Sequence, residues 1–201
     1  RSRVGIAFPD SDFELSATTK KDFSDLAWGI KYGVDYVAES FVGDAKDIIE
    51  LRSRMVEAGA LIPIIAKIER RKAIENIDEI ISTADGIMVA RGDLGVEMPL
   101  EQVPLIQRNL IIRSNKAGIP VIVATQMLAS MVSSIRPTRA EVSDVATAVL
   151  TGTDAVMLSE ETAIGEHPAE CVRYLGKIAA EAEKQFDYEG YQRRVHDAEK
   201  E

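Results

Sequence analysis

The sequence contains a single cysteine, Cys171, so no disulfide can form within the chain. A chain without disulfides fits a reducing compartment, and we expect a cytoplasmic location. Positive charge is also scarce: the sequence has 24 Lys and Arg and 33 Asp and Glu, which gives a net charge of −9. A protein that binds nucleic-acid phosphates needs a basic face, so nucleic acid is not an expected partner. No apolar run approaches the roughly 18 residues of a membrane span, and no membrane association is expected.

Two further absences narrow the chemistry and the fold. The two histidines, His167 and His196, do not stand at zinc-ligand spacing from each other or from Cys171. No glycine-rich dinucleotide fingerprint follows the first predicted strand, which argues against a Rossmann sheet. The remaining composition, 46% apolar and 28% charged, is ordinary for a globular protein.

Five short apolar runs predict five strands. Their centres are continuously apolar, as in parallel strands buried on both faces. The runs cover residues 34–41, 62–69, 84–91, 119–127 and 153–161. Helical patterns precede or separate them, at 19–33, 44–58, 71–82, 101–117, 138–151 and 167–185. Such an alternation leaves two architectures, an open doubly wound sheet or a (β/α)₈ barrel.

Polar clusters at the ends of the predicted strands favour the barrel, because a barrel gathers its chemistry at the carboxyl ends of several strands. The fold class is therefore α/β, a partial (β/α)₈ TIM barrel of about five parallel βα units, three short of closure. The clusters, in chain order, are Ser40 and Phe41; Lys67 and Glu69; Arg91, Gly92 and Asp93; Thr125 and Gln126; and Ser159, Glu160 and Glu161.

These side chains suggest a metal-assisted reaction of an anion. Glu69 and Asp93 offer two hard oxygen ligands, a set typical of Mg²⁺ or Mn²⁺. Lys67 could neutralise charge on a phosphoryl group or an enolate. Gly92 lets the backbone approach a ligand closely and offers its N–H to an anion. A short helix that begins at Asp93 or Leu94 would add its positive N-terminus.

Simpler interpretations exist for each cluster taken singly. Lys67 and Glu69 could form a surface ion pair, and the Arg91–Asp93 tripeptide could be a plain turn or a cell-adhesion sequence. Thr125 could cap the end of its strand, and Ser159 with Glu161 could cap the next helix. All five strand ends being polar in this way favours one shared site.

Several segments resemble the pyruvate kinase family in order and spacing. They are "VDYVAESF", "IIAKIE", "DGIMVARGDLGVEMP", "PVIVATQML" and "RPTRAEVSDVATAVLTGTDAVMLSEETAIGEHP". The similarity runs from about Val4 to about Lys184. It implies a phosphotransferase of glycolysis that moves a phosphoryl group from phosphoenolpyruvate to ADP, giving ATP and pyruvate.

The resemblance also implies a role for each site residue. Lys67 matches the catalytic lysine that stabilises the phosphoryl group, and Glu69 and Asp93 match the Mg²⁺ (or Mn²⁺) ligands. The segment of Ala90, Arg91 and Gly92, followed by Asp93, matches the backbone that holds the substrate carboxylate. The remaining matches are Thr125, beside the substrate methylene, with Gln126 following it; Ser159 and Glu161, implicated in supplying a proton through water; and Ser40 and Phe41, beside the phosphate and K⁺ region.

Parts of the family's enzyme have no counterpart in the sequence. The five units match barrel strands 4–8, so residues 1–186 are expected to be a partial catalytic domain without its first strands and its inserted lid domain. Residues 187–201 are expected to be a linker or the start of a C-terminal domain. The K⁺ ligands are expected outside this chain, the intact protein is expected to be a homo-oligomer, a tetramer, and this piece alone is expected to be inactive.

Two other functions compete with the kinase. One is a magnesium-dependent pyruvate or oxaloacetate aldolase, which would use a similar barrel and paired carboxylates. The other is a half-barrel that binds pyruvate-like acids without catalysis. The Lys67–Glu69 pair followed by Thr125 and Gln126 favours the kinase.

Overall fold

Five parallel strands form one sheet in the computed structural model, which describes residues 18–192. The strands lie in chain order, β1-β2-β3-β4-β5, each hydrogen-bonded to the next along the chain. Their bounds are β1 Val37–Glu39, β2 Ile64–Ile68, β3 Gly86–Ala90, β4 Val121–Ala124 and β5 Ala155–Met157. The predicted parallel α/β order is confirmed, with strands shorter than the apolar runs suggested.

Helices follow or precede every strand. They are α1 Lys20–Tyr32, α2 Ala45–Glu57, α3 Arg71–Glu75, α4 Ile77–Thr83, α5 Arg91–Glu97, α6 Val103–Ala117, α7 Arg139–Thr151, α8 Glu160–Ala163 and α9 Pro168–Glu183, with short 3₁₀ turns η1 Leu100–Gln102 and η2 Ala129–Val132. The predicted single helix over 71–82 is wrong, because the chain breaks at Asn76. The Asn76 side chain donates to the Gly43 carbonyl at 3.0 Å, which holds this break against the loop after β1.

Local sequence signals explain where three helices begin. Thr19 and Asp22 form a reciprocal capping box at α1, and Asp44 with Asp47 forms another at α2. Thr138 caps α7 in the same way. These caps satisfy backbone N–H groups that a first helical turn leaves without partners.

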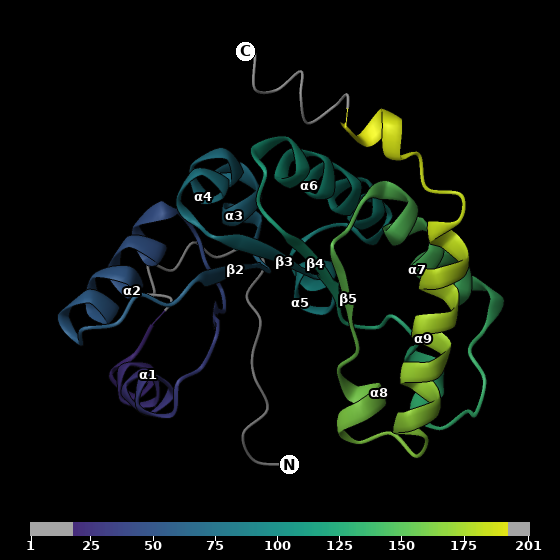
Figure 1. The fold of residues 1–201 in the computed structure, drawn as a ribbon, viewed down its shortest axis with the longest axis horizontal. Coiled ribbons are helices and arrows are strands. Elements are labelled where there is room, and N and C mark those ends of the chain that lie inside the picture. Colours follow the sequence, from purple (N-terminus) through teal and green to yellow (C-terminus); the bar gives the residue numbers. More distant parts are fainter. Residues whose placement is uncertain (1–17, 193–201) are drawn as a thin grey trace.

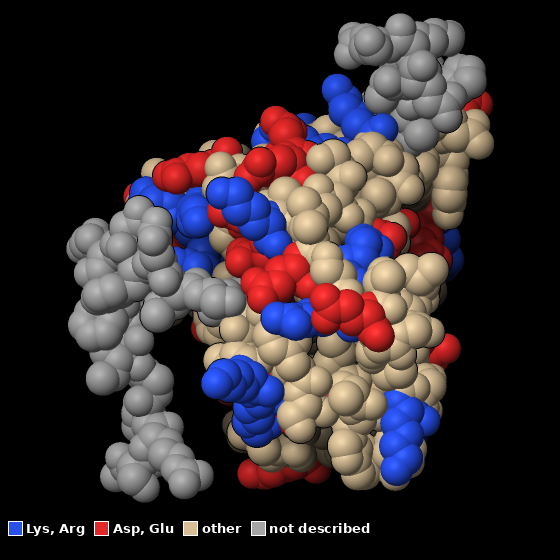
Figure 2. Space-filling view, turned by 90° about the vertical axis from the view of Figure 1, so that its left-hand side faces the viewer, with Lys and Arg blue, Asp and Glu red and all other residues tan. Residues whose placement is uncertain are grey.

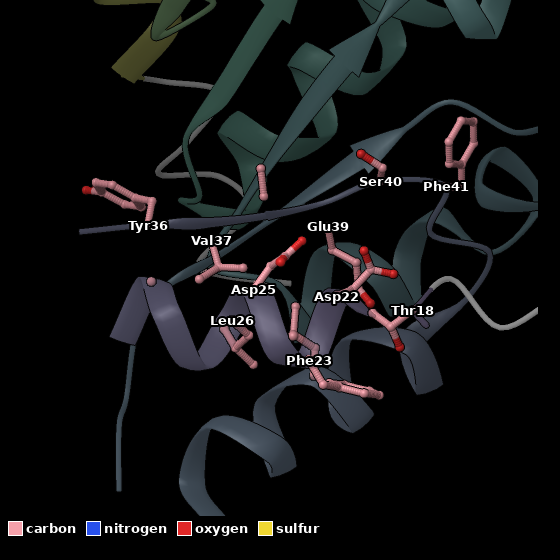
Figure 3. Close-up of a pocket in the computed structure, with 13 residues that line it drawn as sticks. Thr18, Asp22, Phe23, Asp25, Leu26, Tyr36, Val37, Glu39, Ser40 and Phe41 are labelled. Carbon is pink, nitrogen blue, oxygen red and sulfur yellow. The ribbon is translucent and has the colours of Figure 1, made fainter. Parts of the chain in front are cut away.

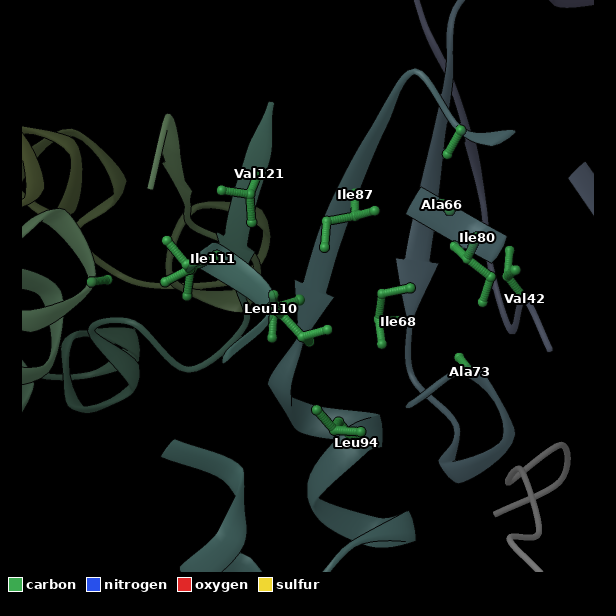
Figure 4. Close-up of a cluster of buried hydrophobic side chains, with 14 of the residues drawn as sticks. Val42, Ala66, Ile68, Ala73, Ile80, Ile87, Leu94, Leu110, Ile111 and Val121 are labelled. Atoms are coloured by element: carbon green, nitrogen blue, oxygen red, sulfur yellow. The ribbon is translucent and has the colours of Figure 1, made fainter. Parts of the chain in front are cut away.

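The helices α2, α4, α6, α7 and α9 form an arc in which each contacts the next, covering one face of the sheet (Figure 1). The main core fills the space between this arc and the sheet. Alternate strand residues such as Ala66, Ile87 and Val121 point into it, and Ile80 and Ile111 meet them from the helices (Figure 4). Burial of this apolar surface is the main force that holds the helices on the sheet.

The opposite face of the sheet carries a smaller apolar cluster and the first candidate site residue. Ile65, Met88 and Ala124 are buried there together. Lys67 lies two residues after Ile65 and pairs in register with Met88, so its side chain leaves the sheet on this same face. In a closed barrel this face is the interior, which places Lys67 above a packed apolar layer.

Within residues 18–192 the sheet stays open. β1 and β5 each pair along one edge only. In the same residues no helix is long and apolar enough to cross a membrane. On the face shown in Figure 2, the described Lys and Arg side chains are interspersed with Asp and Glu rather than gathered in one basic patch. The first residues of the family resemblance, from about Val4 to residue 17, and most of the predicted linker, 193–201, lie outside the described residues.

Glu141, in the first turn of α7, gives a pH-dependent test of this fold. Its carboxylate accepts bonds from the Ser130 N–H (2.7 Å) and hydroxyl (2.6 Å) and from the Thr138 N–H (2.7 Å). Burial raises the pKa of Glu141, but the hydrogen bonds from Ser130 and Thr138 outweigh it and bring the pKa below its ordinary value of 4.5. A carboxylate with a lowered pKa stabilises the fold above that ordinary value, and the gain is lost as pH falls through the folded-state pKa.

Glu141→Gln is therefore expected to lower the free energy of unfolding by about 1–2 kcal/mol at neutral pH. The difference in the free energy of unfolding between the variant and the wild type should shrink as the pH falls below the folded-state pKa of Glu141. Urea denaturation across this pH range measures it, with the exposed Glu101→Gln as control. A loss of equal size at every pH would show that charge at Glu141 is not what stabilises the turn.

Candidate functional site

All the predicted site residues lie at one edge of the sheet, where the strands end. Ser40 and Phe41 follow β1, Glu69 follows β2, and Thr125 and Gln126 follow β4. Lys67 is the second-last residue of β2, Arg91 to Asp93 open α5 directly after β3, and Ser159 precedes α8. Because the strands are parallel, their carboxyl ends meet at this edge, as the sequence predicted.

Lys67 and Glu69 form the centre of the edge. The Lys67 Nζ lies 2.8 Å from Glu69 Oε1 and donates to the Ser40 hydroxyl at 2.8 Å. The second Glu69 oxygen accepts the Phe41 backbone N–H at 2.7 Å. The Glu69 side chain is 1% exposed and that of Lys67 24%. The interpretation as a surface ion pair is therefore wrong: the cation is held at the rim of the sheet by a buried carboxylate.

Strained backbone marks two strand ends at this edge. Phe41, Thr125 and Gln126 have φ angles of 57°, 68° and 54°, and they are the non-glycine residues with positive φ among residues 18–192. This left-handed region costs a residue with a side chain about 1 kcal/mol or more, so it persists where surrounding contacts enforce it. Its restriction to the loops after β1 and β4 is typical of a functional site.

Arg91 holds the strained turn after β4. Its guanidinium donates to the Thr125 carbonyl from both Nη2 (2.8 Å) and Nε (3.2 Å), and its Nη1 donates to Asp144 on α7 at 2.5 Å and to Gln107 on α6 at 3.4 Å. The Arg91 side chain is 10% exposed. An exposed adhesion loop is therefore wrong for this tripeptide, and the guanidinium is a brace between elements rather than a free cation.

Gly92 and Thr125 join the ends of β3 and β4. The Gly92 N–H donates to the Thr125 hydroxyl at 2.7 Å, and that hydroxyl donates to the Ala124 carbonyl at 2.6 Å. A Cβ on Gly92 would lie 3.5 Å from the Thr125 hydroxyl, an ordinary contact. The helix α5 starts at Arg91, earlier than the predicted Asp93 or Leu94. The Gly92 N–H predicted to face an anion is thus engaged by Thr125 in this conformation.

Asp93 and Glu69 fit a divalent cation by their chemistry. The Asp93 side chain is exposed and makes no hydrogen bond or ion pair within residues 18–192. Each Glu69 oxygen has one partner, which leaves a lone pair on each for a metal. The described residues contain no group of three His, Cys, Asp or Glu that could hold a metal. Two carboxylates suit Mg²⁺, which keeps several waters or substrate oxygens, better than zinc or calcium.

Glu161 is buried behind the edge rather than exposed at it. Its side chain is 1% exposed, and its two oxygens accept the backbone N–H groups of Leu128 (3.0 Å) and Ser159 (2.8 Å). The carboxylate therefore joins the loop after β4 to the loop after β5. Ser159 occupies the N-cap position of α8, but its side chain makes no capping bond, so the interpretation of Ser159 as a helix cap is wrong. Glu160, the first residue of α8, is exposed to solvent.

Sequence reasoning missed Asp144, Gln107 and the brace they form with Arg91. Asp144 lies 53 residues from Arg91 and Gln107 lies 16 residues away. Each is an ordinary polar residue of a helix in the sequence. A signal existed only in the topology, because α6 precedes β4, α7 follows it, and the two helices contact each other.

Comparisons with known proteins agree with this geometry. Residues 1–172 match the protein family described as "Pyruvate kinase, barrel domain". Pyruvate kinase 2 of Synechocystis is 54% identical over 184 residues, which cover 92% of this chain and 31% of that protein. Pyruvate kinases of Thermococcus litoralis and Geobacillus stearothermophilus are 50% and 51% identical over 96% and 94% of this chain.

The chain spans 31–40% of the length of these relatives. The matched segment contains every residue of the site edge, from Ser40 to Glu161. Both the family match and the relatives cover nearly all of the described fold. This chain belongs to the pyruvate kinase family, as part of its barrel domain.

Proposed function

We propose that the protein carrying this chain transfers a phosphoryl group from phosphoenolpyruvate to ADP, giving ATP and pyruvate. The observation that carries the proposal is the Lys67–Glu69 pair, a partly exposed cation held 2.8 Å from a buried carboxylate at the carboxyl edge of a parallel sheet. Phosphoryl transfer depends mainly on positioning and on neutralising charge, which such a cation supplies. Membership of the pyruvate kinase family favours this reaction over the aldolase.

The residues at the ends of β2 and β3 have the central roles in this proposal. Lys67, held by Glu69 and Ser40, would meet the negative charge of the phosphoryl group during transfer. Asp93 and Glu69 would hold Mg²⁺ or Mn²⁺, which supplies charge neutralisation and a template for substrate oxygens. The backbone from Ala90 to Gly92 would bind the substrate carboxylate once Thr125 releases the Gly92 N–H.

The loops after β1, β4 and β5 would complete the site. Thr125 would lie at the substrate methylene and take part in proton delivery to the enolate, with Gln126 beside it. Ser159 would contribute to that delivery through water. Ser40 and Phe41 would flank the phosphate, and K⁺ would bind to residues of the longer protein. We place this protein in the cytoplasm, as a homotetramer that binds neither nucleic acid nor membranes.

We further propose that residues 1–186 are a partial barrel domain, that residues 187–201 are a linker or the start of a C-terminal domain, and that the isolated piece is a binder without turnover. Helix α9 ends at Glu183, just before the proposed boundary. The open edges of β1 and β5 within the described residues support this view, because a barrel site needs its neighbouring strands. The piece alone would thus behave as the half-barrel alternative.

Asp93→Asn tests the proposed metal site in the full-length protein. The Mg²⁺ concentration for half-maximal turnover of phosphoenolpyruvate and ADP is expected to rise by about tenfold or more, because a neutral amide is a weaker ligand than a carboxylate. Pyruvate formation and Mn²⁺ binding measured by electron paramagnetic resonance give two separate readouts. Asp35→Asn, also exposed and without a partner in the described residues, is the matched control. An unchanged Mn²⁺ affinity would remove Asp93 from the metal site, and a wild-type protein that forms no pyruvate would overturn the proposed reaction.

A further inference from the structure

The loop between β1 and α2, residues 40–44, contacts both members of the Lys67–Glu69 pair. The side chains of Ser40 and Phe41, at the start of this loop, point away from helix α1 (Figure 3). The Ser40 hydroxyl accepts a bond from Lys67 Nζ at 2.8 Å. The Phe41 N–H donates to a Glu69 carboxylate oxygen at 2.7 Å. The surroundings of the pair therefore depend on where this loop lies.

Asn76 holds the other end of this loop. Its Nδ2 donates to the Gly43 carbonyl at 3.0 Å. The Gly43 N–H donates to the Asp47 carboxylate at 2.7 Å, so side chains engage both backbone polar groups of this buried glycine. The backbone at Gly43 is thus fixed from two sides, immediately after the segment that contacts the Lys67–Glu69 pair.

The Asn76 side chain makes an unusual contact for its place in the fold. Asn76 directly precedes α4, where an asparagine ordinarily accepts the N–H of the second or third helical residue. Within the part of the chain that the structure describes, no such cap bond forms, and the side chain binds the Gly43 carbonyl, 33 residues away in sequence. The contact that this asparagine provides is therefore with the loop and not with the start of its own helix.

Glu69 and Asn76 belong to one short segment, with helix α3 between them, that contacts the loop at two points. A third contact from this segment is the ion pair of Lys72 with Asp44, at 3.0 Å. The Lys72 side chain is 44% exposed, and exposed ion pairs contribute little. The Asn76 bond is partly buried and ends on a backbone carbonyl, so it constrains the position of the loop more directly.

We propose that Asn76 is a positioning residue of the site. Through its bond to Gly43, it keeps the loop 40–44 against Lys67 and Glu69. Its effect on turnover rests on the proposed function, in which Lys67 meets the charge of the phosphoryl group, whereas its effect on the loop does not. A displacement of about 1 Å in a catalytic group can lower a rate about 100-fold, so a small movement of the loop is enough to affect the reaction.

Hydrogen exchange at the Phe41 amide, measured in the full-length protein, reports the position of the loop without an assay of activity. Asn76→Asp keeps the shape of the side chain but replaces the NH₂ donor with an oxygen, and Asn76→Ala removes the bond without adding a charge. Both variants are expected to accelerate exchange at Phe41 by about two- to tenfold, as one lost hydrogen bond would. The Leu128 amide, bonded to the buried Glu161 carboxylate at the same edge, should exchange at the wild-type rate.

Turnover gives the second readout. Per folded molecule, kcat for pyruvate formation is expected to fall about tenfold in both Asn76 variants. The KM for phosphoenolpyruvate should stay within about twofold of the wild type, because the substrate carboxylate is proposed to bind at the end of β3, away from this loop. Asn109→Ala removes an exposed asparagine of α6 that has no hydrogen bond within residues 18–192, and it should leave both readouts unchanged.

Three results would overturn the proposal. They are unchanged exchange at Phe41 in both variants, equal acceleration at Phe41 and Leu128, which a general loss of stability produces, and faster exchange at Phe41 with kcat unchanged. The two variants remove the bond in different ways, so the test does not depend on the folding of either one. A wild-type protein that forms no pyruvate would instead overturn the proposed kinase reaction, and the exchange rates would still decide whether Asn76 positions the loop.

Discussion

Replacing Lys67 with methionine is expected to lower kcat for phosphoryl transfer by about 10²–10³-fold in the full-length protein, the usual effect of removing one charge-stabilising group from an active site. Methionine keeps the length and the apolar stem of lysine but cannot neutralise a transferring phosphoryl group. The Lys67 Nζ is held by Glu69 and Ser40 at 2.8 Å each, so the charge is fixed before the substrate arrives. That preorganisation is what makes a single cation effective.

Binding of Mn²⁺ separates a catalytic role from a structural one in this variant. Glu69 keeps its bond from the Phe41 N–H and loses a competing cation, so the affinity for Mn²⁺ should be retained or increased. Electron paramagnetic resonance measures it alongside the rate, and Lys46→Met on the exposed face of α2 is the control. If Mn²⁺ binding disappears together with turnover, Lys67 supports the architecture of the edge, and its proposed role in charge neutralisation fails.

Parallel topology explains why the site edge was predictable from sequence. Alternation along β2 places Lys67 and Ile65 on one face, and the ends of parallel strands meet. The predicted strands and their parallel order depend on such local signals, and both are found in the structure.

Contacts between distant segments explain what was not predictable. The break between α3 and α4 depends on the Asn76 bond to Gly43, 33 residues away. The Arg91 brace depends on Asp144, and neither residue carries a periodic signal that would indicate the other. Glu39 lies in an apolar run, yet its carboxylate is buried with no hydrogen-bond partner among residues 18–192. Such features follow from packing, which a single sequence does not encode locally.

Two different roles can be assigned to Glu161, and they predict different results when the residue is replaced. The family resemblance assigns it to proton supply through water. The structure shows its carboxylate buried, with one oxygen on the Leu128 N–H and the other on the Ser159 N–H. Those two loops follow β4 and β5, and the first contains Thr125 and Gln126 in left-handed backbone. Geometry therefore favours Glu161 as a positioning residue that sets the spacing of the two loops.

Glu161→Ala is expected to lower the free energy of unfolding by about 2–5 kcal/mol, because the buried Leu128 N–H and the partly buried Ser159 N–H lose their acceptor. Hydrogen exchange at the Leu128 and Ser159 amides should accelerate in the same variant, since each of these amides loses its bond. The neighbouring Glu160→Ala, which removes an exposed carboxylate from the same turn, should change stability by less than about 0.5 kcal/mol. Urea denaturation measures the stability of both variants, and amide hydrogen exchange measures the protection of the two amides in each.

A proton-supply role predicts the opposite pattern. Glu161→Ala would then keep wild-type stability and amide protection, while the rate of enolate protonation falls and its pH profile shifts. Glu161→Gln refines the comparison, because its amide keeps one acceptor oxygen but turns an NH₂ group toward the second backbone N–H. On the positioning role this variant loses stability and amide protection at one loop, whereas on the proton-supply role it keeps both and loses only protonation. Protection lost at one amide and kept at the other would therefore identify the carboxylate as the link between the loops after β4 and β5.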